Sequence, residues 1–167
     1  MTELLPLPDS PDSRDAIRHL YDNAPGYFRA VYGRAWSEEE VIDLFEACPP
    51  AVARTRKHVF GIYDAAKLVG VVDLLQGFPD DQTCYIGLLL LAESHQGKGL
   101  GTRVLTQICT QASHWQLSQL RLAVIETNLP ALNFWRRAGF VRQDRKPIVG
   151  CIADALVMTR PLITKID

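Results

Sequence analysis

Apolar residues recur at two different periods along the chain, and each period predicts a different kind of element. After one short strand at 4–7, the first third shows the three-to-four-residue spacing of helices. We expect Ser13, with Asp12 beside it, to cap a first helix that runs to about Asp22. Ser37 and the three glutamates after it open a second predicted helix, which ends before residue 49, a proline.

Between these helices lies a stretch that predicts no regular element. The segment 23–26, Asn-Ala-Pro-Gly, interrupts the helical period. The residues after it are rich in aromatic side chains: Tyr27, Phe28, Tyr32 and Trp36. Such rings could line a ligand pocket, cover a dimer surface or form part of the core, and core packing is the commonest fate of aromatic residues.

From residue 58 onward the pattern becomes that of strands. Strands are predicted at 58–64, 68–75 and 83–91. The third is apolar almost throughout, which is typical of a central strand covered on both faces. A helix at 100–115 follows, with its apolar residues on one stripe: Leu100, Val104, Leu105, Ile108, Cys109 and Ala112.

The last part of the chain alternates again between strand and helix. The predicted elements are a strand at 120–126, a short helix that starts at Asn128 and Pro130 and stops at Gly139, and strands near 140–143 and 152–159. We therefore expect an α+β fold with a mixed, mostly antiparallel sheet flanked by helices on both faces.

Composition narrows the class of protein. The 167 residues are 47% apolar and 22% charged, and 18 Lys and Arg against 19 Asp and Glu give a net charge of −1. We expect one domain over 1–167 and no nucleic acid as partner. The four cysteines lack paired spacing, which indicates buried free thiols and no metal site. No basic leader is visible, and the longest apolar run, 88–92, is too short to span a bilayer, so we expect a cytoplasmic protein without membrane contact.

A glycine-rich segment, Gln96–Gly101, joins the apolar strand at 83–91 to the helix at 100–115. The first N–H groups of a helix have no intrahelical acceptor, the helix dipole is positive there, and glycine lets the backbone approach an anion closely. The segment therefore predicts a phosphate-binding loop, to which Lys98 adds a mobile cation.

Two other phosphate-binding motifs do not fit the spacing. A nucleoside-triphosphate loop needs glycine where Ala92 stands and Ser or Thr where Gly99 stands. A dinucleotide fingerprint would need a third glycine at Thr102 or Val104. Both nucleotide classes are therefore disfavoured.

The pattern that does fit is Gln-x-x-Gly-x-Gly, formed by Gln96, Gly99 and Gly101. A second motif follows downstream, Asn128-x-x-Ala131-x-x-Phe134-Trp135-x-x-x-Gly139-Phe140. Together, over about residues 58–160, these motifs resemble the GNAT family of N-acetyltransferases. The resemblance implies an acyl-CoA N-acyltransferase fold, acetyl-CoA as cosubstrate, a small-molecule or peptide amine as acceptor, and a homodimer as a further possibility. The cofactor-binding residues it implies are Leu89, Leu91, Gln96, Gly97, Lys98, Gly99, Leu100, Gly101, Thr102, Asn128 and Trp135.

The resemblance also implies how the thioester is held. The strand before the loop would splay from its neighbour, Leu91 would pair with the pantetheine arm, and the Leu89 N–H would face the thioester carbonyl. Asn128 fits either a helix cap or a hydrogen-bond partner of that arm. Trp135 stands where many members carry a tyrosine that protonates the leaving thiolate. An indole has no such proton to give, so Trp135 also fits packing beside Phe134.

The residue that removes the amine proton stays open. Some family members have a glutamate base where this chain has Tyr85, whose ordinary pKa of about 10 makes it a poor base at pH 7. Asp73, a lone acid in an apolar strand, is the first candidate to act through water, and Glu126 is the second. Each of the two acids equally fits a strand-end or solvent-facing position.

Two functions follow from the resemblance. The first is transfer of an acetyl group from acetyl-CoA to a primary amine by direct attack, through a tetrahedral intermediate. The alternative is a CoA-binding module with little turnover, which Tyr85 and Trp135 permit. A basic cluster could meet the 3′-phosphate of CoA or an acidic acceptor, or lie in solvent: Arg136, Arg137, Arg142, Arg145 and Lys146.

Overall fold

The computed structural model describes residues 2–163, and its strands form one sheet in the order β1-β2-β3-β4-β5-β7-β6. Neighbouring strands run antiparallel except β4 and β5, which are parallel. The strands are β1 (Thr2–Pro6), β2 (Lys57–Asp64), β3 (Lys67–Gln76), β4 (Thr83–Leu91), β5 (Gln119–Ile125), β6 (Val141–Lys146) and β7 (Ala155–Pro161). The α-helices are α1 (Pro11–Asp22), α2 (Pro25–Tyr32), α3 (Glu38–Glu46), α4 (Leu100–His114) and α5 (Leu129–Arg137).

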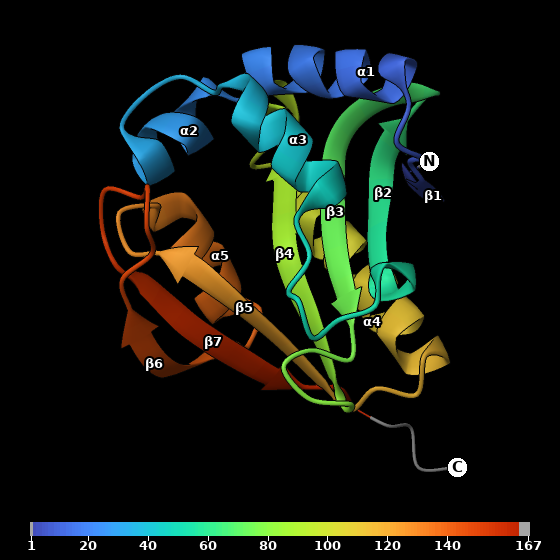
Figure 1. The fold of residues 1–167 in the computed structure, drawn as a ribbon, viewed down its shortest axis with the longest axis vertical. Helices are drawn as coiled ribbons and strands as arrows, with labels where there is room; N and C mark the ends of the chain where they lie inside the picture. The colour runs from blue at the N-terminus through green and yellow to red at the C-terminus, as the bar shows by residue number, and fades with distance from the viewer. Residues whose placement is uncertain (1, 164–167) are drawn as a thin grey trace.

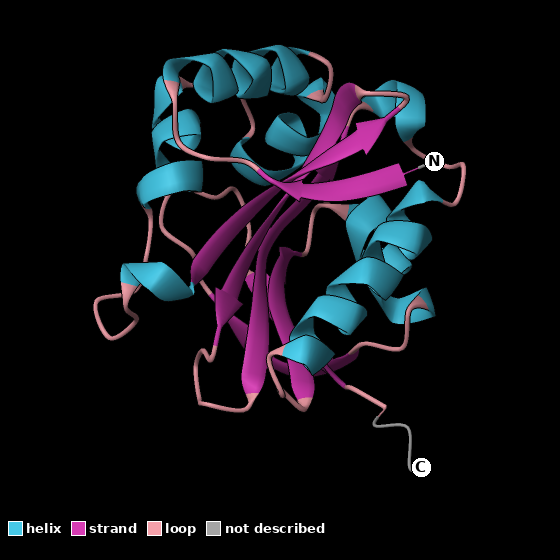
Figure 2. Cartoon of the chain, turned by 90° about the vertical axis from the view of Figure 1, so that its right-hand side faces the viewer, coloured by secondary structure: helices cyan, strands magenta, loops and turns pink. Residues whose placement is uncertain are grey.

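Helices cover both faces of the sheet (Figures 1 and 2). Helices α1, α2 and α3 pack on one face, where Ile17, Phe28 and Val41 share a buried cluster with Val71 of β3. Helices α4 and α5 pack on the other face in a larger cluster that includes Ile108. No helix between residues 2 and 163 combines the length and the apolar character needed to cross a membrane.

The sheet opens between its two central strands. Strands β4 and β5 pair only from Thr83 and Gln119 to Ile86 and Leu122. Beyond these pairs the two strands diverge, as Figure 1 shows, while β4 continues to Leu91 and is paired there with β3 alone. The candidate functional site lies in this wedge.

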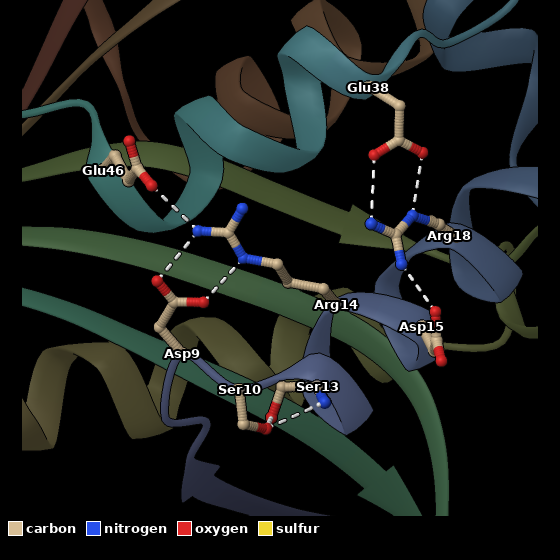
Figure 3. Close-up of polar contacts among 8 residues, drawn as sticks. All are labelled: Asp9, Ser10, Ser13, Arg14, Asp15, Arg18, Glu38 and Glu46. Carbon is tan, nitrogen blue, oxygen red and sulfur yellow. Dashed lines mark hydrogen bonds and ion pairs between the residues drawn. The ribbon is translucent and has the colours of Figure 1, made fainter.

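The layer of α1 and α3 carries a set of surface ion pairs (Figure 3). Arg14 Nε lies 2.7 Å from Asp9 Oδ1, and Arg14 Nη2 lies 2.9 Å from Glu46 Oε1 at the end of α3. Arg18 Nε similarly reaches Glu38 Oε1 at 2.8 Å, at the start of α3. These pairs connect the two helices at both ends of α3, at positions that remain partly open to solvent.

The predicted fold class is confirmed, and the differences lie in the N-terminal third and at strand ends. Helix α2 occupies a stretch where no element was predicted. The predicted cap of the first helix was wrong, because Ser10 is the N-cap and its Oγ accepts the Ser13 N–H at 3.1 Å. The last two strands are β6 and β7 at 141–146 and 155–161, each shifted toward the C-terminus. All four cysteines are free, but the prediction that they are buried holds only for Cys84.

Candidate functional site

A cavity of about 750 Å³ occupies the wedge between β4 and β5. Its walls are the diverging strands, the glycine-rich loop with the start of α4, helix α5, and helix α2. Nine of the residues expected to hold the cofactor line it: Leu89, Leu91, Gln96, Gly97, Gly99, Gly101, Thr102, Asn128 and Trp135.

Backbone groups of β4 face this cavity. Ala92 N–H donates to Val69 O of β3 at 2.8 Å. Because successive N–H groups of a strand point to opposite edges, the N–H groups of Leu91 and Leu89 point away from β3, toward the open side where β5 has diverged. The wedge therefore presents unpaired backbone donors, as an extended ligand would need.

The loop at the end of β4 leads directly into a helix start. Gly97 and Gly99 have positive φ values of 71° and 79°, a left-handed conformation that other residues rarely adopt. The first intrahelical bond of α4 runs from Arg103 N–H to Gly99 O at 3.2 Å. The N–H groups of residues 100–102 therefore have no intrahelical acceptor, and Gly101 and Thr102 line the cavity. Such a group of free donors suits an anion.

The side chain of Gln96 fixes this loop to the strand before it. Its Nε2 donates to Leu91 O at 2.9 Å. The two other loop residues named from the sequence do not line the cavity with their side chains. Lys98 is exposed, and Leu100 is buried in the core, 4% exposed, so only its backbone N–H is available to a ligand.

Helix α5 forms the opposite wall and packs closely on α4. A Cβ on Gly101 would lie 3.2 Å from the Phe134 ring, a tight contact, so glycine favours the close approach of the two helices. Asn128 occupies the N-cap position of α5 without a side-chain hydrogen bond to that helix, is 8% exposed and lines the cavity. Trp135 packs its ring against Phe134 and Phe140, with centroids 4.8 and 5.1 Å away.

Asp73 lies at the edge of the cavity, on the face that α1 and α3 cover. A Cβ on Gly87, which lines the cavity, would lie 2.9 Å from Asp73 Oδ2. Lys57 Nζ lies 3.0 and 2.9 Å from the two carboxylate oxygens. Burial raises the pKa of the Asp73 carboxyl, and the charge of Lys57 opposes part of that rise.

None of the three candidate bases is among the residues that line the cavity. Tyr85 packs its ring against Phe78 at 5.4 Å, and burial raises its pKa, so even less of it is ionised and able to accept a proton at neutral pH. Glu126 accepts two hydrogen bonds from Arg145, at 2.8 and 3.1 Å, from across β7. Asp73 thus lies beside Gly87 of the cavity wall and pairs with Lys57, whereas Glu126 pairs with Arg145.

Several cavity residues were not identified from the sequence. Gly26, Ala30 and Val31 come from α2, and Glu93 comes from the short 3-10 helix Glu93–His95. Of the aromatic residues that could line a pocket, Tyr27 does so, whereas Phe28 is buried in the core. Of the predicted basic cluster, Arg137 alone contributes to the lining described between residues 2 and 163. Pro25 at the first helical position and left-handed Gly33 after the last are the usual signals of helix ends, and they could have located α2.

Comparison with known proteins agrees with this geometry. A family model described as "Acetyltransferase (GNAT) family" matches residues 15–140. The uncharacterized N-acetyltransferase YobR of Bacillus subtilis (strain 168) is 29% identical over 99 residues, which are 58% of this chain and 36% of that protein. The matched region thus spans about a third of that relative's length.

Two solved structures share the fold over nearly their whole length. An acetyltransferase from Thermus thermophilus superimposes with a TM-score of 0.77 at 25% identity, covering 97% of both chains. A spermidine N-acetyltransferase from Vibrio cholerae, crystallised with CoA and spermine, has a TM-score of 0.70 at 19% identity and covers 96% of this chain and 95% of its own.

Proposed function

The chain belongs to the GNAT family of acetyltransferases, and from this premise we propose that it moves the acetyl group of acetyl-CoA to a primary amine. The observation that carries the proposal is the wedge between β4 and β5, which opens directly onto the free N–H groups at the start of α4. One extended ligand with a phosphate group at one end fits both features.

In this proposal the pyrophosphate of acetyl-CoA binds the backbone of 96–102. The free N–H groups of residues 100–102 and the positive end of the α4 dipole favour two negative charges there. The pantetheine arm then follows β4, where the Leu91 N–H is unpaired, with Asn128 on the opposite wall. The cavity of about 750 Å³ is large enough for such an extended arm.

The acetyl group then lies near Leu89. Attack of the amine nitrogen on the thioester carbon forms a C–N bond and places negative charge on the carbonyl oxygen. The Leu89 N–H stabilises that charge, and one preorganised donor of this kind contributes about 3 kcal/mol in a measured protease. When the intermediate collapses, the C–S bond breaks and the thiolate of CoA leaves. A thiol with an ordinary pKa of about 8.5 leaves without a strong acid, so Trp135 need not supply a proton.

Asp73 is the base that we propose. Its carboxylate lies next to Gly87, which lines the cavity, and in this proposal one water molecule relays the proton from the amine to it. A raised pKa brings a carboxylate closer to neutral pH and makes it a better base. Tyr85 stays protonated and offers a hydrogen bond only.

In this proposal the acceptor enters beside α2, where Tyr27 borders the cavity and the β6–β7 connection packs against the helix. A small amine or a peptide amino group fits this proposal, and the spermidine enzyme with a similar fold shows that the architecture accepts polyamines in another protein. A homodimer through a sheet edge remains part of the proposal, because β6 is an edge strand with all six residues exposed.

Thermal melting with and without acetyl-CoA tests the proposal, together with release of free thiol in the presence of a panel of amines. A ligand at 100 times its Kd stabilises a protein by about 2.7 kcal/mol. We expect this stabilisation in the wild type and its loss in Gly97→Glu, which puts a negative side chain into the phosphate loop.

Gly150→Glu is the matched control, because both glycines have positive φ, 71° and 87°, and at both positions an added Cβ would have no atom within 4 Å. Both variants carry the same backbone strain, but only Gly97 lines the cavity. If acetyl-CoA does not stabilise the wild type, the proposed site is wrong. Stabilisation without thiol release for any amine would instead support the CoA-binding module.

A further inference from the structure

Helix α2 has a first turn that its own sequence cannot cap. Its N-cap is Ala24, which has no side-chain acceptor, and Pro25 occupies the first helical position. The N–H of Gly26 therefore needs an acceptor from elsewhere in the molecule. Glu93 supplies it, because its Oε1 accepts the Gly26 N–H at 2.8 Å.

A second hydrogen bond joins the same two segments. The Glu93 N–H donates to Asn23 O at 2.8 Å, so both the backbone and the side chain of Glu93 hold the start of α2. The contact is close, because a Cβ on Gly26 would lie 2.9 Å from Glu93 Oε1. The carboxylate also faces the positive end of the α2 dipole, which stabilises its charge next to a loop suited to phosphate.

Glu93 belongs to the cofactor side of the cavity, whereas α2 belongs to the acceptor side. Glu93 follows β4 by two residues and precedes Gln96, whose side chain returns to Leu91 O at 2.9 Å. Helix α2 contributes Tyr27 to the cavity wall. The hydrogen bond from Gly26 to Glu93 thus connects the two sides directly.

The other end of α2 is fixed separately. Thr127 Oγ1 donates to Ala30 O at 2.6 Å, and Ile152 N–H donates to Val31 O at 3.0 Å. An eight-residue helix has little stability of its own, so its position depends on burial of Phe28 and Val31 and on these contacts at its two ends. Removing the contact at Glu93 frees the first turn, which carries Tyr27.

We propose that Glu93 is a positioning residue that caps α2 and thereby couples occupation of the phosphate loop to the order of the acceptor-side wall. The coupling rests on the proposed function, in which the loop binds CoA, whereas the cap itself does not. When CoA fixes the loop, Glu93 is held, and α2 is held with it. The acceptor then meets an ordered wall only after the cosubstrate is in place.

Hydrogen–deuterium exchange of the full-length protein tests both parts, with free CoA as the probe. Without CoA, we expect Glu93→Ala to speed exchange at Gly26 and residues 29–32 roughly five- to ten-fold, the size expected for loss of a helix cap. Glu93→Gln keeps an oxygen acceptor and should stay near the wild-type rate. Glu39→Ala, an exposed glutamate on α3, controls for loss of charge.

With CoA, we expect α2 to gain protection in the wild type and in Glu93→Gln but not in Glu93→Ala. Unchanged exchange of α2 in Glu93→Ala without CoA would overturn the cap. Equal protection of α2 by CoA in wild type and Glu93→Ala would overturn the coupling. Melting curves with CoA show separately whether the proposed site binds CoA. If CoA stabilises neither the wild type nor Glu93→Ala, the proposed CoA site is wrong. The cap is then judged from the exchange rates without CoA.

Discussion

The phosphate loop (Gln96–Gly101) and the layer formed by helices α1, α2 and α3 (the α1–α3 layer) are stabilised in different ways. The loop is held by backbone geometry, with two glycines in a left-handed conformation and one side-chain hydrogen bond from Gln96. The α1–α3 layer combines a buried aromatic cluster with exposed ion pairs of Arg14 and Arg18 (Figure 3). We expect the loop to tolerate few other residues at its glycine positions. We expect the surface ion pairs to tolerate replacement, because each contributes little to stability. The predictions that follow test this difference, from the largest effect to the smallest.

Phe28→Ala should have the largest effect on stability. Phe28 is 1% exposed, and its ring lies 4.8 Å from Tyr21 and 5.0 Å from Tyr27. Removing a buried phenyl ring costs about 3–5 kcal/mol of unfolding free energy. Urea denaturation measures it, with Leu129→Ala, at an exposed position, as control. A loss below about 1 kcal/mol would mean that the aromatic cluster does not hold the α1–α3 layer.

Asp73→Asn tests the proposed base. We expect roughly a hundred-fold lower turnover, because a positioned base contributes about that much. A carboxylate base works only when deprotonated, so wild-type activity should fall as the pH drops through the raised pKa of Asp73. A rate profile against pH shows whether that acid limb disappears in the variant. An unchanged limb would assign the base elsewhere, and melting with acetyl-CoA checks that the cosubstrate still binds.

Gln96→Glu changes one hydrogen bond of the loop at constant size. A carboxylate cannot donate to Leu91 O, and one intramolecular hydrogen bond contributes about 1 kcal/mol. The Kd for CoA, measured by calorimetry, should therefore rise roughly five-fold. Gln143→Glu makes the same charge change on exposed β6 and should leave Kd unaltered. Equal effects of the two variants would indicate a general effect of charge and contradict the role given to the Gln96 side chain.

Arg14→Met and Arg18→Met should have the smallest effects. Ion pairs open to solvent contribute little, because water screens the charges and ordering two long side chains costs entropy. We expect melting temperatures that cannot be distinguished from the wild type at high salt. Thermal melting of both single variants and the double variant measures this. A loss comparable to that of Phe28→Ala would place the ion pairs among the main supports of the layer.

The same difference explains which features could be predicted from the sequence. Strand β4 and the loop after it depend on local residue types, namely an apolar run followed by glycines before a helix. Helix α2 was missed because it spans only eight residues and has no side-chain cap of its own. The acceptor for its Gly26 N–H is Glu93, far along the chain. The wedge between β4 and β5 followed only from family resemblance, because pairing that stops after Ile86 has no signature in either strand.

The candidate bases show why the role of a single side chain could not be predicted from the sequence. From the sequence Asp73 was the first candidate and Glu126 the second, and each also fitted a strand-end or solvent-facing position. Their difference comes from contacts with residues distant in sequence, since Lys57 approaches Asp73 from β2 and Arg145 reaches Glu126 from β6. Strand order and register decide such contacts, and neither can be read from the residue types alone.

The short parallel ladder between β4 and β5 also determines how far the cavity reaches into the sheet. The apex of the wedge lies where pairing ends, at Ile86 and Leu122. Strands rise about 3.3 Å per residue, so each residue pair added to the ladder would move the apex by that distance and shorten the space beyond the thioester. That step corresponds to between two and three carbon–carbon bonds. If acetyl-CoA binds as proposed, the number of paired residues in this ladder would limit the room beyond the acetyl group, without a change in any residue of the phosphate loop.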